Sequence, residues 1–198
     1  NTIEKNQVEL KQRQDDFNNL QETIQQLQKD LEKEKEQKHI DYLTGLLNRR
    51  AYEIEIKKFE KKYKVFDSSF AVVFLDIDHF KKINDSYGHD IGDSALKEVT
   101  KILEKNIQGD ALISRLGGEE FCILLANRDK EEIGFLLENI RKDFQNNKIS
   151  TSIGELNYTV SIGWSFEFKA NLDEMIQVAD DCLYDAKESG RNQVRYRT

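Results

Sequence analysis

Carboxylates occur in this sequence where a buried strand should end. FLDID at 74–78 closes an apolar run and brings Asp76, and Asp78 two residues on, to the same face of that strand. A carboxylate there is costly unless it is solvated, paired or metal-bound. The helix predicted next, beginning HFKK, offers free N–H groups to phosphate oxygens. The stretch therefore indicates a metal–phosphate site, although Asp78 acting only as a helix cap is an equally good interpretation.

A second acidic stretch, LGGEEF at 116–121, lies between two apolar segments. Gly117 and Gly118 permit positive φ in a tight turn and leave room for a large ligand. If this hairpin lies beside FLDID, Glu119 or Glu120 can approach Asp76. A few hard oxygen ligands completed by phosphates suit Mg²⁺, and two such ions about 3.5–4 Å apart polarise a phosphate and activate a hydroxyl. Taken alone, the stretch is equally a polar hairpin tip.

The elements that must position these side chains form an α/β pattern from about residue 41. Helices are expected at 48–64, 79–88, 93–107, 130–144 and 172–189, and strands at 69–78, 111–116, 120–126, 158–166 and 192–197. The alternation predicts one sheet covered by helices. The hairpin at 111–126 requires an antiparallel pair, so the sheet should be mixed.

Residues 1–40 differ in composition, being rich in Gln, Glu, Lys and Asn and lacking Gly. Apolar residues recur at heptad spacing: Ile3, Leu10, Phe17, Ile24 and Leu31, with Leu20 and Leu27 at the second seam position. We expect a coiled-coil helix of about 60 Å that forms a parallel homodimer, because a single helix would expose this stripe. A solvated single helix is the alternative.

The bulk composition restricts the function classes. The chain has 198 residues and a net charge of −7, which argues against a nucleic-acid-coating protein. Cys122 and Cys182 lie in apolar runs and are expected to be buried free thiols of a reducing compartment. No run of 18 apolar residues occurs, which predicts a soluble, cytoplasmic chain. The sequence begins at Asn1 and not at Met, which indicates a fragment or a processed form. We expect an upstream sensor domain in the longer protein, and any membrane anchor would also lie upstream.

Five motifs together resemble the GGDEF domain of diguanylate cyclases. They are DYLTGLLNRR at 41–50, DIDHFKKINDSYGHDIGD at 76–93, RLGGEEF at 115–121, YTVSIGW at 158–164 and ADDCLYDAKESGRNQV at 179–194. The resemblance covers residues 41–198 and implies a palm-like α/β fold. It implies that two GTP are condensed into cyclic di-GMP with release of two pyrophosphates.

The resemblance also implies roles for the acidic residues and one lysine. Asp76, the carbonyl of Ile77 and Glu119, with Glu120 as a further candidate, would ligate Mg²⁺, or Mn²⁺ in its place. Glu119 or Glu120 would help to deprotonate the attacking 3′-hydroxyl, and the sequence does not divide that role. Lys81 would stabilise charge in the transition state.

Further residues are implied in nucleotide binding. Asn84 and Asp93 would read the guanine edge, and His89 would line its pocket. The phosphates would be met by His79, Phe80 and Lys81 at the helix start and by Lys187 and Arg191 at the end of the last helix. Gly117 and Gly118 would make room for the nucleotide, while Asp78 and Asp85 fit the pattern only as supporting residues.

One departure from the family pattern concerns regulation. Many members carry Arg-x-x-Asp as a product-binding site, but Gln108, Gly109, Asp110 and Ala111 stand here, so strong inhibition through this site is not expected. The main hypothesis is an active cyclase working as a dimer of half-sites. The alternatives are a silent GGDEF module that binds GTP or cyclic di-GMP, and a chain whose function is the coiled coil alone.

Overall fold

The computed structural model describes residues 39–65, 69–151, 154–167 and 171–197, and a few residues nearer the N-terminus. The chain separates into two compact units, Asn1–His39 and Ile40–Thr198. The few described residues of the first unit are helical: Arg13, Leu20, Gln21, Thr23, Ile24, Gln26 and Leu27. Most of the predicted coiled coil at 1–40 lies outside the described residues, so it stays a prediction.

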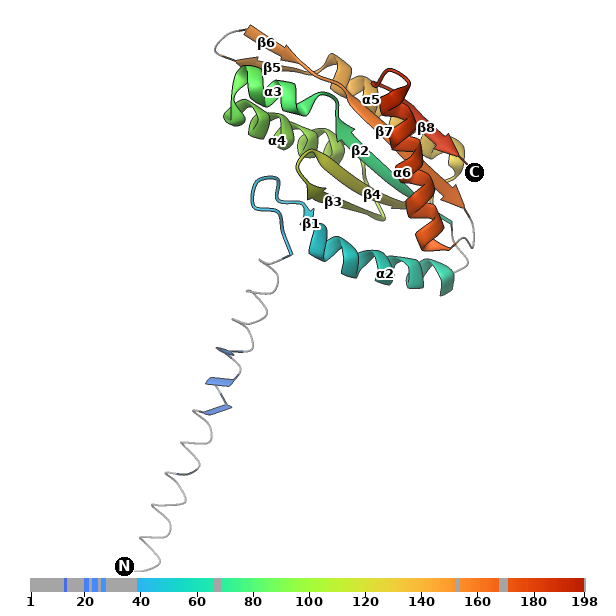
Figure 1. Ribbon diagram of the computed structural model, residues 1–198. Helices are drawn as coiled ribbons and strands as arrows, with labels where there is room; N and C mark the ends of the chain where they lie inside the picture. Colours follow the sequence, from blue (N-terminus) through green and yellow to red (C-terminus); the bar gives the residue numbers. More distant parts are fainter. Residues whose placement is uncertain are drawn as a thin grey trace, which may run out of the picture. The chain divides into compact units, whose positions relative to one another are not determined.

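A six-stranded mixed sheet forms the centre of the second unit, in the order β1-β3-β4-β2-β7-β8 (Figure 1). Its strands are β1 (Leu47–Asn48), β2 (Phe70–Ile77), β3 (Ala111–Gly117), β4 (Glu120–Ala126), β7 (Val160–Glu167) and β8 (Val194–Arg197). β2 is antiparallel to both β4 and β7, and β3 is antiparallel to β4. The two outer pairs, β1 with β3 and β7 with β8, are parallel. The predicted mixed sheet is confirmed.

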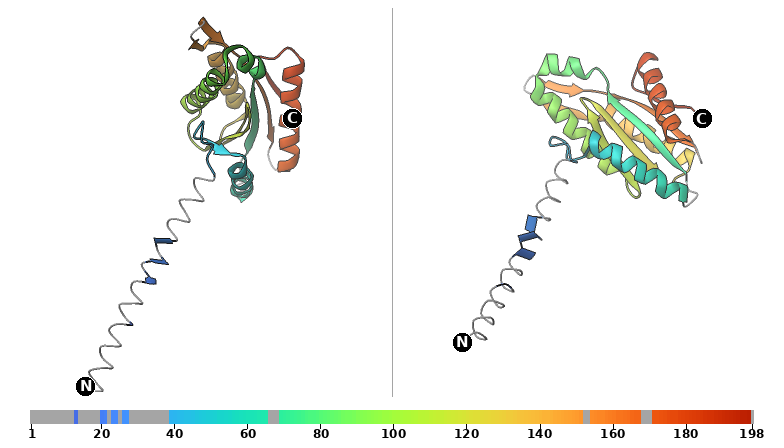
Figure 2. Two further views of the ribbon diagram at one scale, coloured as in Figure 1. Left: turned by 60° about the vertical axis from the view of Figure 1, so that its left-hand side comes forward. Right: turned by 60° about the horizontal axis from the view of Figure 1, so that its bottom comes forward.

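Helices cover both faces of this sheet (Figure 2). On one face lie α3 (Phe80–Tyr87), α4 (His89–Asn106) and α5 (Lys130–Asn146), and on the other α2 (Arg49–Val65) and α6 (Leu172–Glu188). All eight residues of β2 are buried. Both faces of β2 are covered because successive side chains point to opposite sides of the sheet. Val73 and Leu75 pack in the core under α4 and α5, whereas Val72 and Phe74 pack in the core under α2 and α6.

The structure corrects three expectations. A separate hairpin of β5 (Lys148–Thr151) and β6 (Gly154–Asn157) forms a second small sheet, so a single sheet was wrong. The two-residue strand β1 was also not predicted. Helix α4 begins at His89, directly after Gly88, and not at residue 93, so Gly92 lies within the helix.

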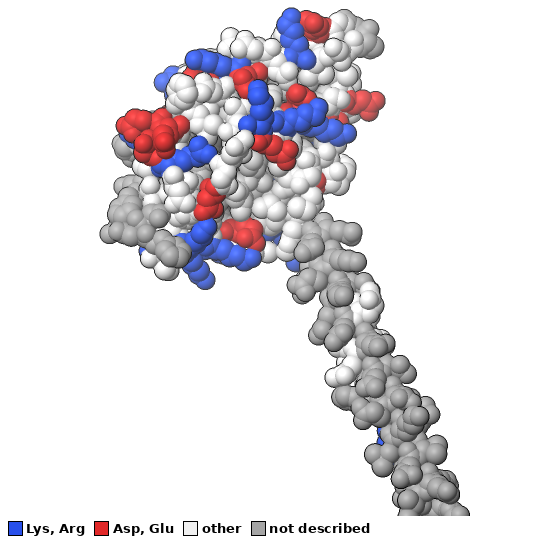
Figure 3. All heavy atoms as spheres, turned by 180° about the vertical axis from the view of Figure 1, so that it is seen from behind, with Lys and Arg blue, Asp and Glu red and all other residues white. Residues whose placement is uncertain are grey.

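Other expectations agree with the structure. Cys122 and Cys182 are buried free thiols, as predicted. Acidic and basic side chains are interspersed over the face seen in Figure 3. Among the described residues, no helix combines the length and the hydrophobicity needed to cross a membrane.

Candidate active site

Asp76 and Glu120 lie side by side at one end of the sheet. They are direct cross-strand partners on the antiparallel strands β2 and β4, and such partners point to the same side of a sheet. Glu119 lies in the turn immediately before β4. The predicted approach of the hairpin carboxylates to Asp76 is therefore confirmed.

The turn that carries Glu119 is held in place by an arginine that the sequence did not single out. Gly118 adopts φ 47°, a conformation open to glycine at little cost. Its carbonyl accepts hydrogen bonds from Arg115 Nε at 3.1 Å and Nη2 at 2.8 Å. Arg115 Nη1 donates to Asp41 Oδ1 at 3.0 Å. In the sequence, the only indication that Arg115 and Asp41 belong to the site was their presence in two of the motifs shared with the family.

Asp76 is a buried carboxylate with one cationic partner. Its residue is 6% exposed, and Lys187 Nζ lies 2.7 Å from Asp76 Oδ2. Burial, the largest influence, raises the pKa of Asp76 to about 6, and the negative charges of Glu119 and Glu120 act in the same direction. Lys187 opposes the shift. The site therefore has more negative charge than its lysine neutralises.

This acidic cluster does not form a complete cation site by itself. Within the described ranges, no three His, Cys, Asp or Glu side chains are arranged so that they could hold a metal ion. The available donors, Asp76 with Glu119 and Glu120 beside it, are the hard oxygens that Mg²⁺ prefers. The residues thus fit a cation whose coordination is completed by oxygen atoms from elsewhere, such as phosphates.

The predicted guanine-reading residues lie on α3 and α4, which meet at Gly88. Asn84 is half-buried, and a Cβ added at Gly92 would lie 1.9 Å from its Oδ1 atom. Because Gly92 has no Cβ atom, the Asn84 side chain can occupy this space. Asp93 follows directly and is exposed. Gly92 is a functional candidate that the sequence reasoning missed.

The residues predicted to meet phosphates occupy two places. His79 is the N-cap of α3 with φ 58° and is exposed, as are Lys81 and His89. Phe80 is buried in the core below them. Lys187 lies in the last turn of α6, and Arg191 follows in the next turn with φ 64°. Only Lys187 of these residues is brought into contact with Asp76.

The interpretation of Asp78 as a helix cap is wrong. The N-cap of α3 is His79, and no side chain caps that end. Asp78 accepts hydrogen bonds from Ser161 Oγ on β7 at 2.7 Å and from Thr159 Oγ1, directly before that strand, at 2.6 Å. These two hydroxyl donors outweigh a local capping contact, because they satisfy the hydrogen-bonding capacity of the buried carboxylate.

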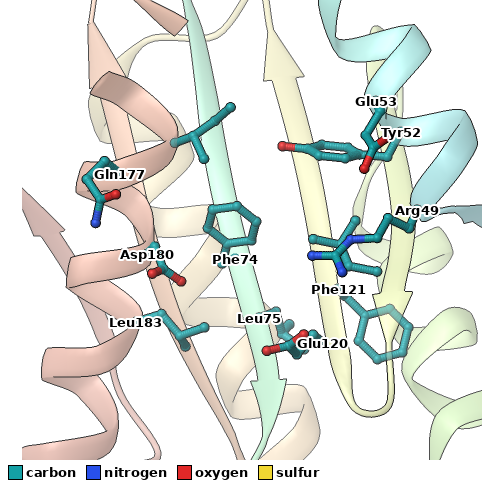
Figure 4. A pocket seen from close by; sticks show the side chains of 12 residues that line it. Arg49, Tyr52, Glu53, Phe74, Leu75, Glu120, Phe121, Gln177, Asp180 and Leu183 are labelled. Carbon is teal, nitrogen blue, oxygen red and sulfur yellow. The ribbon is translucent and has the colours of Figure 1, made fainter. Parts of the chain in front are cut away.

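A cavity of about 290 Å³ adjoins the carboxylates on the side of α2 and α6. Arg49 from α2 and Asp180 from α6 point into it from opposite sides, and Phe74 forms part of its floor (Figure 4). Of the predicted site residues only Glu120 lines it. The cavity therefore lies next to the predicted nucleotide site and does not contain it.

The sheet order and the paired carboxylates at the ends of two central antiparallel strands define a palm-like α/β domain, the class predicted from the sequence. The family described as "Diguanylate cyclase, GGDEF domain" matches residues 38–193. The chain belongs to this GGDEF domain family.

Curated relatives agree with this assignment. The chain is 39% identical over 163 residues to "Uncharacterized protein YhcK" of Bacillus subtilis, covering 80% of this chain and 45% of the relative. It is 38% identical over 165 residues to "Probable diguanylate cyclase DgcT" of Escherichia coli, covering 80% and 36%. The chain thus spans less than half the length of these two relatives.

Solved structures agree as well. The coiled coil and GGDEF domain of DgcB from Caulobacter crescentus, in complex with c-di-GMP, matches with a TM-score of 0.82 at 27% identity, covering 88% of this chain and 93% of that one. Diguanylate cyclase SiaD from Pseudomonas aeruginosa, in complex with its activator SiaC, matches with a TM-score of 0.77 at 29% identity, covering 99% and 76%.

Proposed function

We propose that this chain is an active diguanylate cyclase that condenses two GTP into cyclic di-GMP and two pyrophosphates. The observation that carries the proposal is the pairing of Asp76 with Glu120, with Glu119 in the adjoining turn and Lys187 at 2.7 Å from Asp76. Acidic and basic groups for phosphoryl transfer are therefore both present at one end of the sheet. Membership of the GGDEF family and the names of relatives such as the probable diguanylate cyclase DgcT support the same activity.

In this reaction the 3′-oxygen of each GTP attacks the α-phosphorus of the other. One oxygen–phosphorus bond forms as the bond to pyrophosphate breaks, and this happens twice for each product. Glu119 or Glu120 accepts the proton that the 3′-hydroxyl loses. Lys81 at the start of α3 and Lys187 and Arg191 at the end of α6 bind the phosphate oxygens and stabilise their charge.

The resemblance implies a divalent cation, and the donors fit it if phosphates complete its shell. Asp76, the carbonyl of Ile77 and Glu119 would hold it, with Glu120 beside them. Such a cation would supply charge neutralisation at the phosphates, and hard oxygen donors suit Mg²⁺, with Mn²⁺ as its alternative. Lys187 already neutralises part of Asp76, so we infer that its ammonium moves to the terminal phosphates when the cation and GTP bind.

We further propose that two chains are needed and that residues 1–40 join them. Each chain has one set of guanine-reading candidates, whereas the product contains two guanines related by two-fold symmetry. Three apolar residues of this region are helical and exposed: Leu20 (58%), Ile24 (47%) and Leu27 (58%). They leave an apolar stripe that a second copy of the helix can cover. The coil raises the effective concentration of the second half-site. Control by an upstream sensor domain and a cytoplasmic location are parts of the same proposal.

The proposal is tested by incubating the chain with GTP and Mg²⁺ and separating the products by chromatography. The native chain should release cyclic di-GMP and pyrophosphate, whereas Glu119→Ala should lose at least about a hundredfold in rate. Omitting residues 1–40 should make the rate per chain fall more steeply on dilution. GTP binding without any turnover by the native chain would instead identify a silent binding module.

Guanine recognition gives a second prediction, at Gly92. In Gly92→Ala the new Cβ would lie 1.9 Å from Asn84 Oδ1, which must rotate away, and 3.3 Å from Phe80 Cζ. Because the clash is with the far end of a side chain, we expect α4 to remain folded. Loss of the Asn84 contact should raise KM for GTP about tenfold.

The control for this prediction is Ser94→Ala, an exposed substitution two residues further along α4. It should leave KM unchanged. The double variant Asn84→Ala/Gly92→Ala should be no worse than Asn84→Ala, since both remove the same contact. A native KM in Gly92→Ala would show that Asn84 does not read the base.

A further inference from the structure

Asp78 is a buried carboxylate for which the cyclase reaction has no assigned role. Its residue is 5% exposed. Besides the hydroxyls of Thr159 and Ser161, its Oδ2 atom accepts a hydrogen bond from the backbone N–H of Asn192 at 3.0 Å. Three donors compensate the burial of the charge. One of them comes from a segment 114 residues away along the chain.

That segment is the turn after α6, and its backbone is in an uncommon conformation. Gly190, Arg191 and Asn192 have φ values of 109°, 64° and 48°. Two consecutive non-glycine residues in the left-handed region are unfavourable unless their surroundings hold them there. The Arg191 N–H donates back to the Ala186 carbonyl at 2.9 Å, which closes the helix end.

Asn192 is fixed from two sides. Asp78 at the end of β2 accepts its backbone N–H, and Arg141 on α5 donates from Nη1 to its Oδ1 atom at 2.7 Å. Neither contact involves Arg191 itself. Besides the local bond to Ala186, the conformation of the turn, and with it the position of the Arg191 backbone, is therefore held by Asp78, which directly follows β2, and by Arg141 on α5.

The turn connects two parts of the proposed site. Asp76 is the penultimate residue of β2, and Asp78 directly follows that strand. Asp76 contacts Lys187 in the last turn of α6, and Asp78 holds the turn one residue beyond Arg191. We propose that Asp78 is a positioning residue that, together with Arg141, sets Arg191 to bind the terminal phosphates of GTP. This inference rests on the function proposed above.

The test is a binding measurement with 3′-deoxy-GTP, which lacks the attacking hydroxyl and cannot be turned over. Its Kd is measured by calorimetry with Mg²⁺ and compared with the Kd of GMP, which lacks the terminal phosphates. Asp78→Ala and Arg141→Met should each weaken 3′-deoxy-GTP binding about tenfold and leave GMP binding unchanged. Combining Arg141→Met with Arg191→Ala should weaken binding no further than Arg191→Ala alone.

Two variants separate positioning from general support of the fold. Asp78→Asn can still accept from Asn192 N–H and should restore most of the affinity. Ser161→Ala removes only the donor to the other oxygen, Oδ1, and should bind as the native chain does. If Asp78→Ala does not fold, Arg141→Met tests the same turn from α5.

Two results would overturn the proposal. Equal loss of GMP and 3′-deoxy-GTP affinity in Arg141→Met and Asp78→Ala would show that these residues only support the fold. If the losses of 3′-deoxy-GTP affinity in Arg141→Met and Arg191→Ala add fully in the double variant, Arg141 acts independently of Arg191. Failure of the native chain to bind 3′-deoxy-GTP would refute the proposed function itself, a distinct outcome visible before any variant is compared.

Discussion

Asp76→Asn should make the domain more stable at neutral pH while abolishing cyclase activity. The native carboxylate is buried, and its pKa is raised to about 6. Compared with the ordinary value of 3.8, this corresponds to a cost of about 3 kcal/mol when the group is ionised at pH 7. Asparagine has nearly the same shape and no charge, so part of that cost should be recovered. Lys187, 30% exposed, can be solvated by water when its partner is removed.

The pH dependence of this effect has a definite sign. Between about pH 4 and pH 6 the folded state binds more protons at Asp76 than the unfolded state, so the native free energy of unfolding falls as pH rises. In Asp76→Asn this carboxylate is absent, so its titration no longer changes the free energy of unfolding between these pH values. The two proteins should therefore differ little at pH 4, whereas at pH 7.5 the variant should be about 1–3 kcal/mol more stable. Its cyclase rate should fall at least about a hundredfold, because a predicted cation ligand is lost.

Urea unfolding at pH 4, 6 and 7.5 measures the first effect, and the GTP assay measures the second. Asp110→Asn is the matched control. Hydrogen bonds from Lys62 and Tyr63 hold the pKa of Asp110 below its ordinary value, so this variant should not gain stability at any of these pH values. A variant at Asp76 that is less stable than the native chain at pH 7.5 would disprove the electrostatic argument.

Gly163→Ala should be the most destabilising single change in the sheet. A Cβ at Gly163 on β7 would lie 2.0 Å from Leu183 N, 2.4 Å from Ala179 O and 2.6 Å from Cys182 C. These are backbone atoms of α6, so no side-chain rotation can relieve the overlap. The helix must move away from the strand, which should cost at least about 3 kcal/mol. The same movement would take Lys187 away from Asp76 and so reduce activity in any molecules that remain folded.

Gly134→Ala on α5 is a matched control with the same chemical change. Its Cβ would meet only Trp164 Cζ2, at an ordinary contact distance of 3.6 Å. Because alanine favours a helix interior over glycine, this variant should gain about 0.5–1 kcal/mol. Urea midpoints for the two variants should therefore move in opposite directions from the native value. Equal midpoints for Gly163→Ala and the native chain would mean that α6 does not pack this closely.

Local pattern was enough to predict much of the fold. The strand expected at 69–78 is β2 (Phe70–Ile77), and the two strands around the glycine turn are β3 and β4. These strands could be predicted because a continuous apolar run and a turn glycine involve only residues that are adjacent in the sequence. The hairpin of β5 and β6 was missed because its strands are short and largely polar, and within these two strands only Leu156 is buried.

The sequence by itself determined which chemical groups are available: Asp76, Glu119 and Glu120, two turn glycines, and Lys187 with Arg191. It also identified the family to which these groups belong. Only the tertiary structure decided that Lys187 pairs with Asp76, and that Asp78 holds a distant turn and does not cap its own helix. These contacts join segments about a hundred residues apart. Their partners are chosen by strand order and by the burial of charge, which no local pattern specifies.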